Sequence, residues 1–226
     1  MNAQIKQRAK DIMKADMTNM LIGAAIFAAV SLVSSALTGG LVGNAVAGLI
    51  NAVAGACAAR FYFRAYNRGK ADVNDIFALL KDNAHLPKIL TIMLAMWLVN
   101  VIVEIISSFL IFIPLVGPIA VLVIALLVSL LLRIVWHLFV ANPQYPTEYY
   151  LKGSSSYMGG QLVAYIVFSF SVAFVPALIE ILVSIFVGGT IANILCIPFD
   201  AYISLATAGF VATIIPDEWY NGTAQL

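Results

Sequence analysis

The sequence predicts an all-α membrane protein: a polytopic bundle of six transmembrane helices, with short amphipathic helices on its cytoplasmic side. Three observations carry this prediction. The chain is 62% hydrophobic and only 10% charged, whereas soluble domains carry roughly 25% charged residues. Its apolar residues form six runs that are long enough to cross a bilayer. The Lys and Arg residues gather at one end of these runs, and the positive-inside rule places that end in the cytoplasm.

The segment 2–16 is expected to form a helix with an apolar face and a basic face. The apolar face holds Ile5, Ala9, Ile12 and Met13, and the basic face holds Lys6, Lys10 and Lys14. Such a helix either lies in the headgroup layer, with its lysines toward anionic lipid, or is a solvated flank that only orients the first span.

Six spans follow, and the turn after each odd-numbered span carries no charge. Their approximate bounds are residues 18–37, 42–63, 89–113, 119–140, 161–187 and 191–215. Small residues recur along one face of the second span, and small residues let helices approach closely in lipid. We therefore expect this helix inside the bundle, or at a dimer interface. Six spans place both termini in the cytoplasm and make residues 1–226 one integral domain of the inner (cytoplasmic) membrane.

Two charged crossovers join the spans on the cytoplasmic side. The first, residues 60–88, is expected to hold an amphipathic helix of about ten residues. Its apolar face would consist of Val73, Ile76, Phe77 and Leu80, with Asp75 on the opposite face and Pro87 starting the third span. In the second crossover, residues 142–160, the serines at positions 154–156 are expected in a loop. Trp219 and Tyr220, beyond the last span, suit the membrane interface.

An offset of 73 residues aligns the two crossovers without a gap. The aligned pairs are Arg60 with Arg133, Arg64 with His137, and Asp75 with Glu148. This pattern suggests a parallel repeat, which occurs in transporters and also in proteins that transport nothing. Chance matching between apolar segments would give a similar alignment.

Three acidic residues lie within the predicted spans: Glu104, Glu180 and Asp200. A charge at the centre of a membrane helix costs roughly 2.5–3.5 kcal/mol, so such residues usually have a partner, a cavity or a proton. They form a candidate intramembrane polar site for an ion or substrate. Alternatively, they are protonated acids that hydrogen-bond to neighbouring helices, or acids near the outer interface.

Four basic residues are candidate contacts for lipid headgroups: Arg60, Arg64, Arg133 and His137. The last two stand four residues apart on the fourth span and would either bind a lipid phosphate or anchor the helix end. The sequence shows no catalytic constellation, no metal-ligand spacing and no cofactor motif. Its net charge of +1 indicates no broad basic surface for nucleic acid.

Several segments resemble a family of bacterial integral membrane proteins catalogued as domain of unknown function 975. The segments are IKQRAKDIMKAD, then GKADVNDIFALLK with Asp75, Phe77 and Lys81, then Asn142-Pro143 with Ser154 and Tyr157-Met158-Gly159, and finally Ile197-Pro198-Phe199. The distance from Pro114 to Asn142 is longer than is usual in that family, and the Tyr-Ser pair of the family is missing there. The resemblance implies a multi-spanning bacterial membrane protein and no particular activity.

Two functions follow as hypotheses. The first is a non-enzymatic structural or accessory component that binds lipid or a partner through its cytoplasmic helices. The second is a transporter or exporter of ions or small molecules that uses the intramembrane carboxylates. The expected partners are the lipid bilayer and, beyond it, another membrane protein or a second copy of this chain.

Overall fold

The computed structural model describes residues 2–81, 84–114 and 116–224, and over these residues the chain is helical, without β-strands. The helices in this described part are α1 (Asn2–Ala15), α2 (Met17–Ala36), α3 (Gly40–Arg68), α4 (Asn74–Phe77), α5 (His85–Leu110), α6 (Val116–Leu131), α7 (Val135–Ala141), α8 (Thr147–Gly159), α9 (Leu162–Val187), α10 (Gly189–Ile214) and α11 (Asp217–Tyr220). Six stretches are long and apolar enough to cross a membrane: Met17–Ala36, Val42–Arg68, His85–Leu110, Val116–Ala141, Leu162–Phe186 and Ile194–Ile214. The predicted all-α fold with six spans is confirmed.

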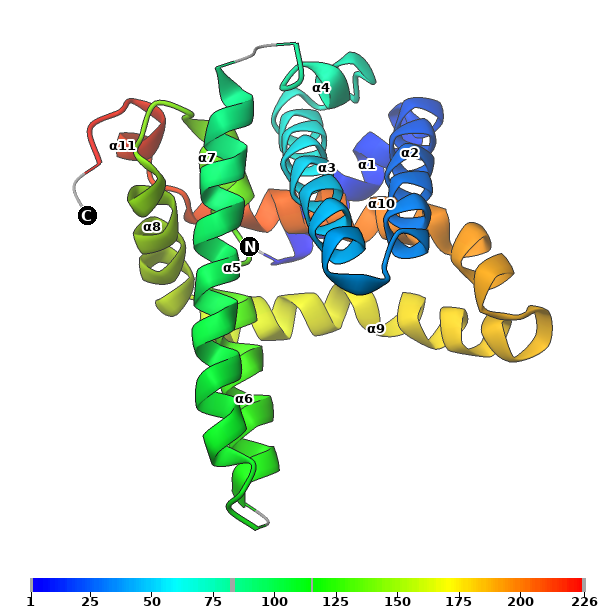
Figure 1. Cartoon of the computed structure of the whole chain (residues 1–226). Helices are drawn as coiled ribbons and strands as arrows, with labels where there is room; N and C mark the ends of the chain where they lie inside the picture. The colour runs from blue at the N-terminus through cyan, green and yellow to red at the C-terminus, as the bar shows by residue number, and fades with distance from the viewer. Residues whose placement is uncertain (1, 82–83, 115, 225–226) are drawn as a thin grey trace.

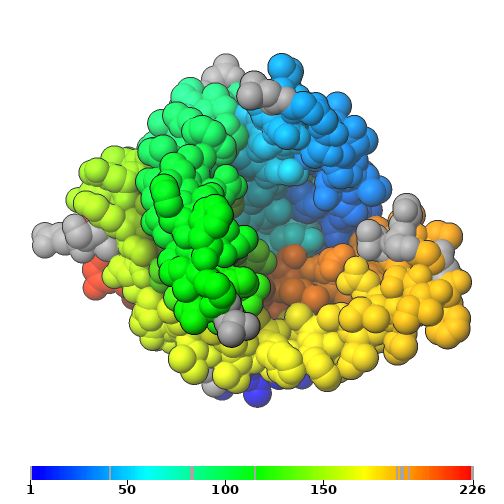
Figure 2. All heavy atoms as spheres, turned by 60° about the horizontal axis from the view of Figure 1, so that its bottom comes forward, coloured from blue at the N-terminus to red at the C-terminus, as the bar shows by residue number. Residues whose placement is uncertain are grey.

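The spans form three helical hairpins, α2–α3, α5–α6 and α9–α10, which diverge from a common base (Figure 1). The base contains α1, α4, α7, α8 and α11, and the three hairpin tips point in different directions. Viewed from the side of the tips, the molecule is hollowed between the hairpins, with part of α10 visible at the floor (Figure 2). The three hairpins therefore pack together at the base and stand apart at their tips.

Helix α3 is the central element of the base, because it contacts α2, α4, α5, α7 and α10. One of the small residues on its predicted face, Gly55, makes this packing close, whereas a Cβ atom added at Gly48 would meet nothing within 4 Å. A Cβ atom added at Gly55 would lie 3.2 Å from the indole nitrogen of Trp136 on α7, so a larger side chain there would push α7 away. Helix α3 ends five residues later than its predicted span, at Arg68, where Gly69 adopts the left-handed conformation that closes many helices.

The fourth span is one stretch in the prediction and two helices in the structure. Helix α6 ends at Leu131 and α7 begins at Val135. Across this break the amide of Arg133 bonds the carbonyl three residues earlier instead of four, which tightens the turn. The hydroxyl of Ser154 donates a hydrogen bond to the carbonyl oxygen of Leu131. A polar side chain from α8 thus satisfies a backbone group at the break.

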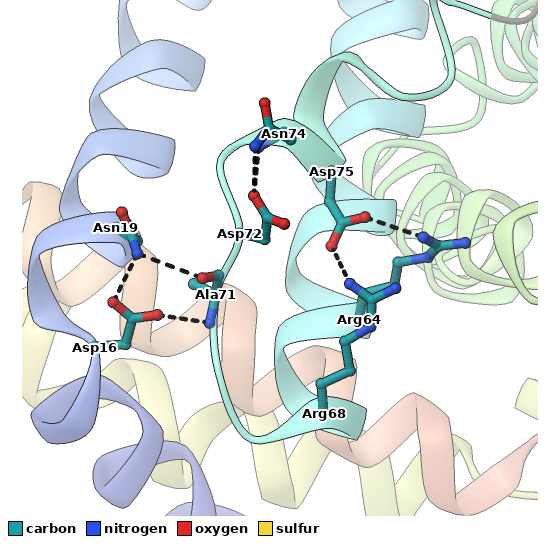
Figure 3. A network of polar contacts seen from close by, with 8 residues as sticks. All are labelled: Asp16, Asn19, Arg64, Arg68, Ala71, Asp72, Asn74 and Asp75. Atoms are coloured by element: carbon teal, nitrogen blue, oxygen red, sulfur yellow. Dashed lines mark hydrogen bonds and ion pairs between the residues drawn. The ribbon is translucent and has the colours of Figure 1, made fainter.

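The first crossover contains a shorter helix than predicted, and its charged residue points inward. Helix α4 has four residues instead of about ten, and Asp75 is buried. Its carboxylate accepts hydrogen bonds from Arg64 at 3.0 Å and Arg68 at 2.8 Å (Figure 3). The assignment of Asp75 to the solvent face was therefore wrong, because two guanidinium groups on α3 compensate its burial. Phe77, expected on the apolar face of that helix, is 43% exposed. Residue 82 of the predicted helix lies outside the described residues.

The same crossover is tied to the N-terminal helices. The backbone amide of Ala71 donates to the carboxylate of Asp16, which also accepts a hydrogen bond from Asn19, both at 2.9 Å (Figure 3). At the exposed turn before α4, the amide of Asn74 bonds the carboxylate of Asp72, and this bond lowers the pKa of Asp72. The loop is therefore held in place by hydrogen bonds to Asp16 and Asp72, and a long amphipathic helix is not needed.

The second crossover and the C-terminal segment form an aromatic cluster around Trp219. The serines at 154–156, expected in a loop, lie in α8. Trp219, predicted to suit the membrane interface, is fully buried within the protein, and its indole N–H donates to the carbonyl of Leu138 at 3.0 Å. Burial among these rings raises the pKa of Tyr150 and Tyr157. The cluster forms because α11 folds back onto α7 and α8, which the sequence pattern does not show.

Candidate functional site

A cavity of about 290 Å³ lies between α3, α7 and α10. Its polar lining comes from Tyr62, Arg133, Trp136, His137, Ser204 and Thr207. Every one of these side chains is able to donate a hydrogen bond, and none of the described residues that line the cavity carries a carboxylate. We call it the donor cavity. A cavity with a guanidinium, an indole N–H and several hydroxyls is suited to an oxyanion such as phosphate.

One atom of the donor cavity's lining stands without a partner. The Nδ1 atom of His137 is buried and makes no hydrogen bond to any residue that the structure describes. The ring of His137 packs edge-on against Phe63, with 6.1 Å between ring centroids. Buried polar atoms are usually satisfied, so an unpaired nitrogen beside a polar cavity favours a bound group there.

A second cavity, of about 320 Å³, adjoins the donor cavity and shares Ala58, Tyr62 and Ser204 with it. It lies between α2, α3 and α10 and is lined by one carboxylate, that of Asp200. Asp200, Ser204 and Thr207 follow i, i+4, i+7 spacing and therefore share one face of α10. Tyr62 thus stands between an acidic cavity and a basic one, along a single polar stripe of α10.

One of the three predicted intramembrane acids lines the cavity beside Tyr62. Asp200 lines the cavity beside Tyr62, whereas neither Glu104 nor Glu180 does. Glu180 on α9 lies near enough to Asp200 for their charges to interact. Glu104 is exposed on α5, in a different hairpin, and its backbone carbonyl accepts a hydrogen bond from Ser108. The structure therefore places Glu180 within electrostatic range of Asp200 and places Glu104 on a different hairpin.

Two of the four basic residues predicted to contact lipid headgroups line the donor cavity, and the other two do not. Arg133 and His137 line the donor cavity together, as their i, i+4 spacing suggests. Arg64 is paired with Asp75 instead. Arg60 has a buried Nε atom without a hydrogen-bond partner among the described residues, and it does not line the donor cavity.

Sequence reasoning missed Tyr62, Trp136, Ser204 and Thr207. The i, i+4, i+7 spacing of Asp200, Ser204 and Thr207 could have predicted a polar face on the last span. Tyr62 and Trp136 join the site only through the packing of α3 against α7 and α10, and no local pattern marks them. Among the described residues no group of three His, Cys, Asp or Glu side chains could hold a metal ion.

Comparison with protein-family models, with curated proteins and with solved structures gives no match for this chain. The fold and the two cavities therefore place the chain in a broad class of protein. It is a multi-pass α-helical membrane protein with a polar site between its central helices.

Proposed function

We propose that this chain is a non-enzymatic accessory component of the bacterial inner membrane, and that it binds the phosphate of an anionic lipid headgroup in the donor cavity. The observation that carries this proposal is the lining of that cavity, which has Arg133 and five other donors and no carboxylate. A phosphate accepts several hydrogen bonds at once, and Arg binds it in a two-pronged geometry. The resemblance to the uncharacterised bacterial family supports the membrane assignment and adds no activity.

The distribution of charge supports a cytoplasmic location for both termini. The described tips of the three hairpins carry no Lys or Arg, whereas the base carries the basic residues of α1, the end of α3, and α8. Basic residues stay on the cytoplasmic side of bacterial membranes. Arg133 lies in the last third of the fourth span, within reach of the headgroup layer for a long, flexible side chain.

Changing Arg133 to Gln is expected to weaken the retention of anionic phospholipid about tenfold or more, because a charge-assisted contact to phosphate is lost. The measurement is the amount of bound phosphatidylglycerol after purification in a mild detergent, counted by native mass spectrometry. Lys152→Gln is the matched control, since it removes one exposed positive charge from α8 outside the cavity. Equal lipid retention by Arg133→Gln and the wild-type protein would contradict the proposal.

A transporter is the second candidate function, and the proximity of Glu180 to Asp200 favours it. If these carboxylates carry protons, Asp200→Asn is expected to abolish the collapse of a pH gradient imposed across proteoliposomes. Glu104→Gln should leave that collapse unchanged, because Glu104 is exposed on another hairpin. A wild-type protein that leaves the gradient intact would contradict proton conduction through these carboxylates, with a pH-sensitive dye inside the vesicles as the readout.

A further inference from the structure

We propose that the groove between α1 and the α9–α10 hairpin binds a phospholipid that carries two phosphate groups. This site is separate from the donor cavity and shares no lining residue with it. Its volume is about 640 Å³. We call it the lysine groove.

The basic wall of the lysine groove is a face of α1 that the packing holds in place. Ile5, Ala9 and Ile12 are buried in the core. Arg8 donates hydrogen bonds from its guanidinium to the carbonyl oxygens of Tyr66 and Asn67, at 2.9 and 3.2 Å, at the end of α3. Because these contacts fix the rotation of α1 about its axis, its remaining face is directed into the groove.

The charged side chains on that face are Lys6, Lys10 and Lys14, and Ala3, Gln7 and Met13 line the groove beside them. In the described part of the chain, none of the three lysines forms an ion pair. The nearest acid in the sequence, Asp11, accepts a hydrogen bond from Gln7 and does not line the groove. Three positive charges without carboxylate partners therefore face one open space.

The opposite wall is largely apolar. It consists of Val172, Val175 and Pro176 on α9 together with Pro198, Phe199 and Tyr202 on α10. A small soluble anion would gain nothing from this wall, whereas the acyl chains of a lipid would cover it. The combination of a cationic wall and an apolar wall therefore selects an amphiphile with a negative headgroup.

The spacing of the lysines indicates how many phosphates the headgroup carries. Each step of four residues along an α-helix rises about 6 Å, so the three lysines extend over about 12 Å. A single phosphate group is much smaller than this distance and would contact only two neighbouring lysines. A headgroup with two phosphates joined by a short linker, as in cardiolipin, would meet all three.

The test uses the full-length protein in nanodiscs of phosphatidylcholine that contain either cardiolipin or phosphatidylglycerol, at equal total anionic phosphate. Lipids that survive release into mild detergent are counted by native mass spectrometry. The wild-type protein should retain one cardiolipin more tightly than any phosphatidylglycerol. Each Lys→Gln change in the groove should weaken this retention about fivefold.

The triple variant K6Q/K10Q/K14Q should lose the tightly held cardiolipin, and the matched variant K70Q/K81Q/K152Q, which removes three exposed lysines elsewhere, should keep it. A triple Lys→Arg variant in the groove keeps the charge and should also retain the lipid, which separates loss of binding from loss of folding. Equal retention of phosphatidylglycerol, or equal loss in both Gln variants, would overturn the proposal. Arg133→Gln should lower the retention of phosphatidylglycerol by the donor cavity without removing the tightly held cardiolipin of the lysine groove, so each of the two proposals can fail without the other.

Discussion

Replacing Trp219 with alanine is expected to lower the free energy of unfolding by about 3–5 kcal/mol, the usual cost of removing a fully buried aromatic side chain. Trp219 is 0% exposed, and its ring centroid lies 4.5 Å from that of Tyr145 and 6.0 Å from those of Tyr150 and Tyr157. The variant also loses the hydrogen bond to the carbonyl of Leu138. Both the ring contacts and the hydrogen bond are lost at the place where α11 packs against α7 and α8.

The measurement is the thermal unfolding midpoint in detergent, followed by the reaction of a thiol-specific dye. Cys57 and Cys196 suit this readout because both are free and buried, and they become reactive only when the core opens. Trp97→Ala is the matched control, since Trp97 is 58% exposed and should have a much smaller effect. An equal midpoint for Trp219→Ala and wild type would show that the C-terminal segment does not stabilise the core.

Replacing Asp75 with alanine is expected to lower the free energy of unfolding by about 1–2 kcal/mol. The change removes two charge-assisted hydrogen bonds, which are each worth more than a neutral one. The guanidinium side chains of Arg64 and Arg68 are 35% and 46% exposed, and they would remain partly hydrated. For this reason the expected loss is smaller than for a fully buried ion pair.

The same thiol assay measures this effect, with Asp72→Ala as the control in the same loop. Asp72 is exposed and bonds only its near neighbour Asn74, so its replacement should cost less. Asp75→Asn tests the role of charge, because the amide keeps the shape and loses the negative charge. If Asp75→Ala and Asp72→Ala shift the midpoint equally, the paired arginines contribute nothing particular to the fold.

The spans and their number were predictable because long apolar runs and the positions of Lys and Arg are properties of the sequence itself. The positions of single charged side chains were less predictable. Asp75 falls on the polar face of any helix drawn through 73–80, and only the approach of α3 provides the two arginines that bury it. Trp219 follows the last span as an interface residue would, yet α11 folds inward.

In the candidate site, too, some features were predictable from the sequence and others were not. The pairing of Arg133 with His137 follows from helical spacing, and both line the donor cavity. The prediction that Glu104, Glu180 and Asp200 form one polar site relied on their positions within the predicted spans. Depth along the membrane normal gives no information about lateral distance, and the hairpins that carry these residues diverge (Figure 1).

The divergence of the hairpins also has a consequence for biogenesis. Each hairpin pairs two helices that are consecutive in the chain, and in both views the tips stand clear of one another (Figures 1 and 2). Two consecutive apolar helices can enter the bilayer together as one unit, so translation would deliver three such units in turn. The base can close only after the last of them has arrived, since α11 completes it. A chain truncated at residue 215 should therefore insert its three hairpins and leave the base unfinished and sensitive to protease.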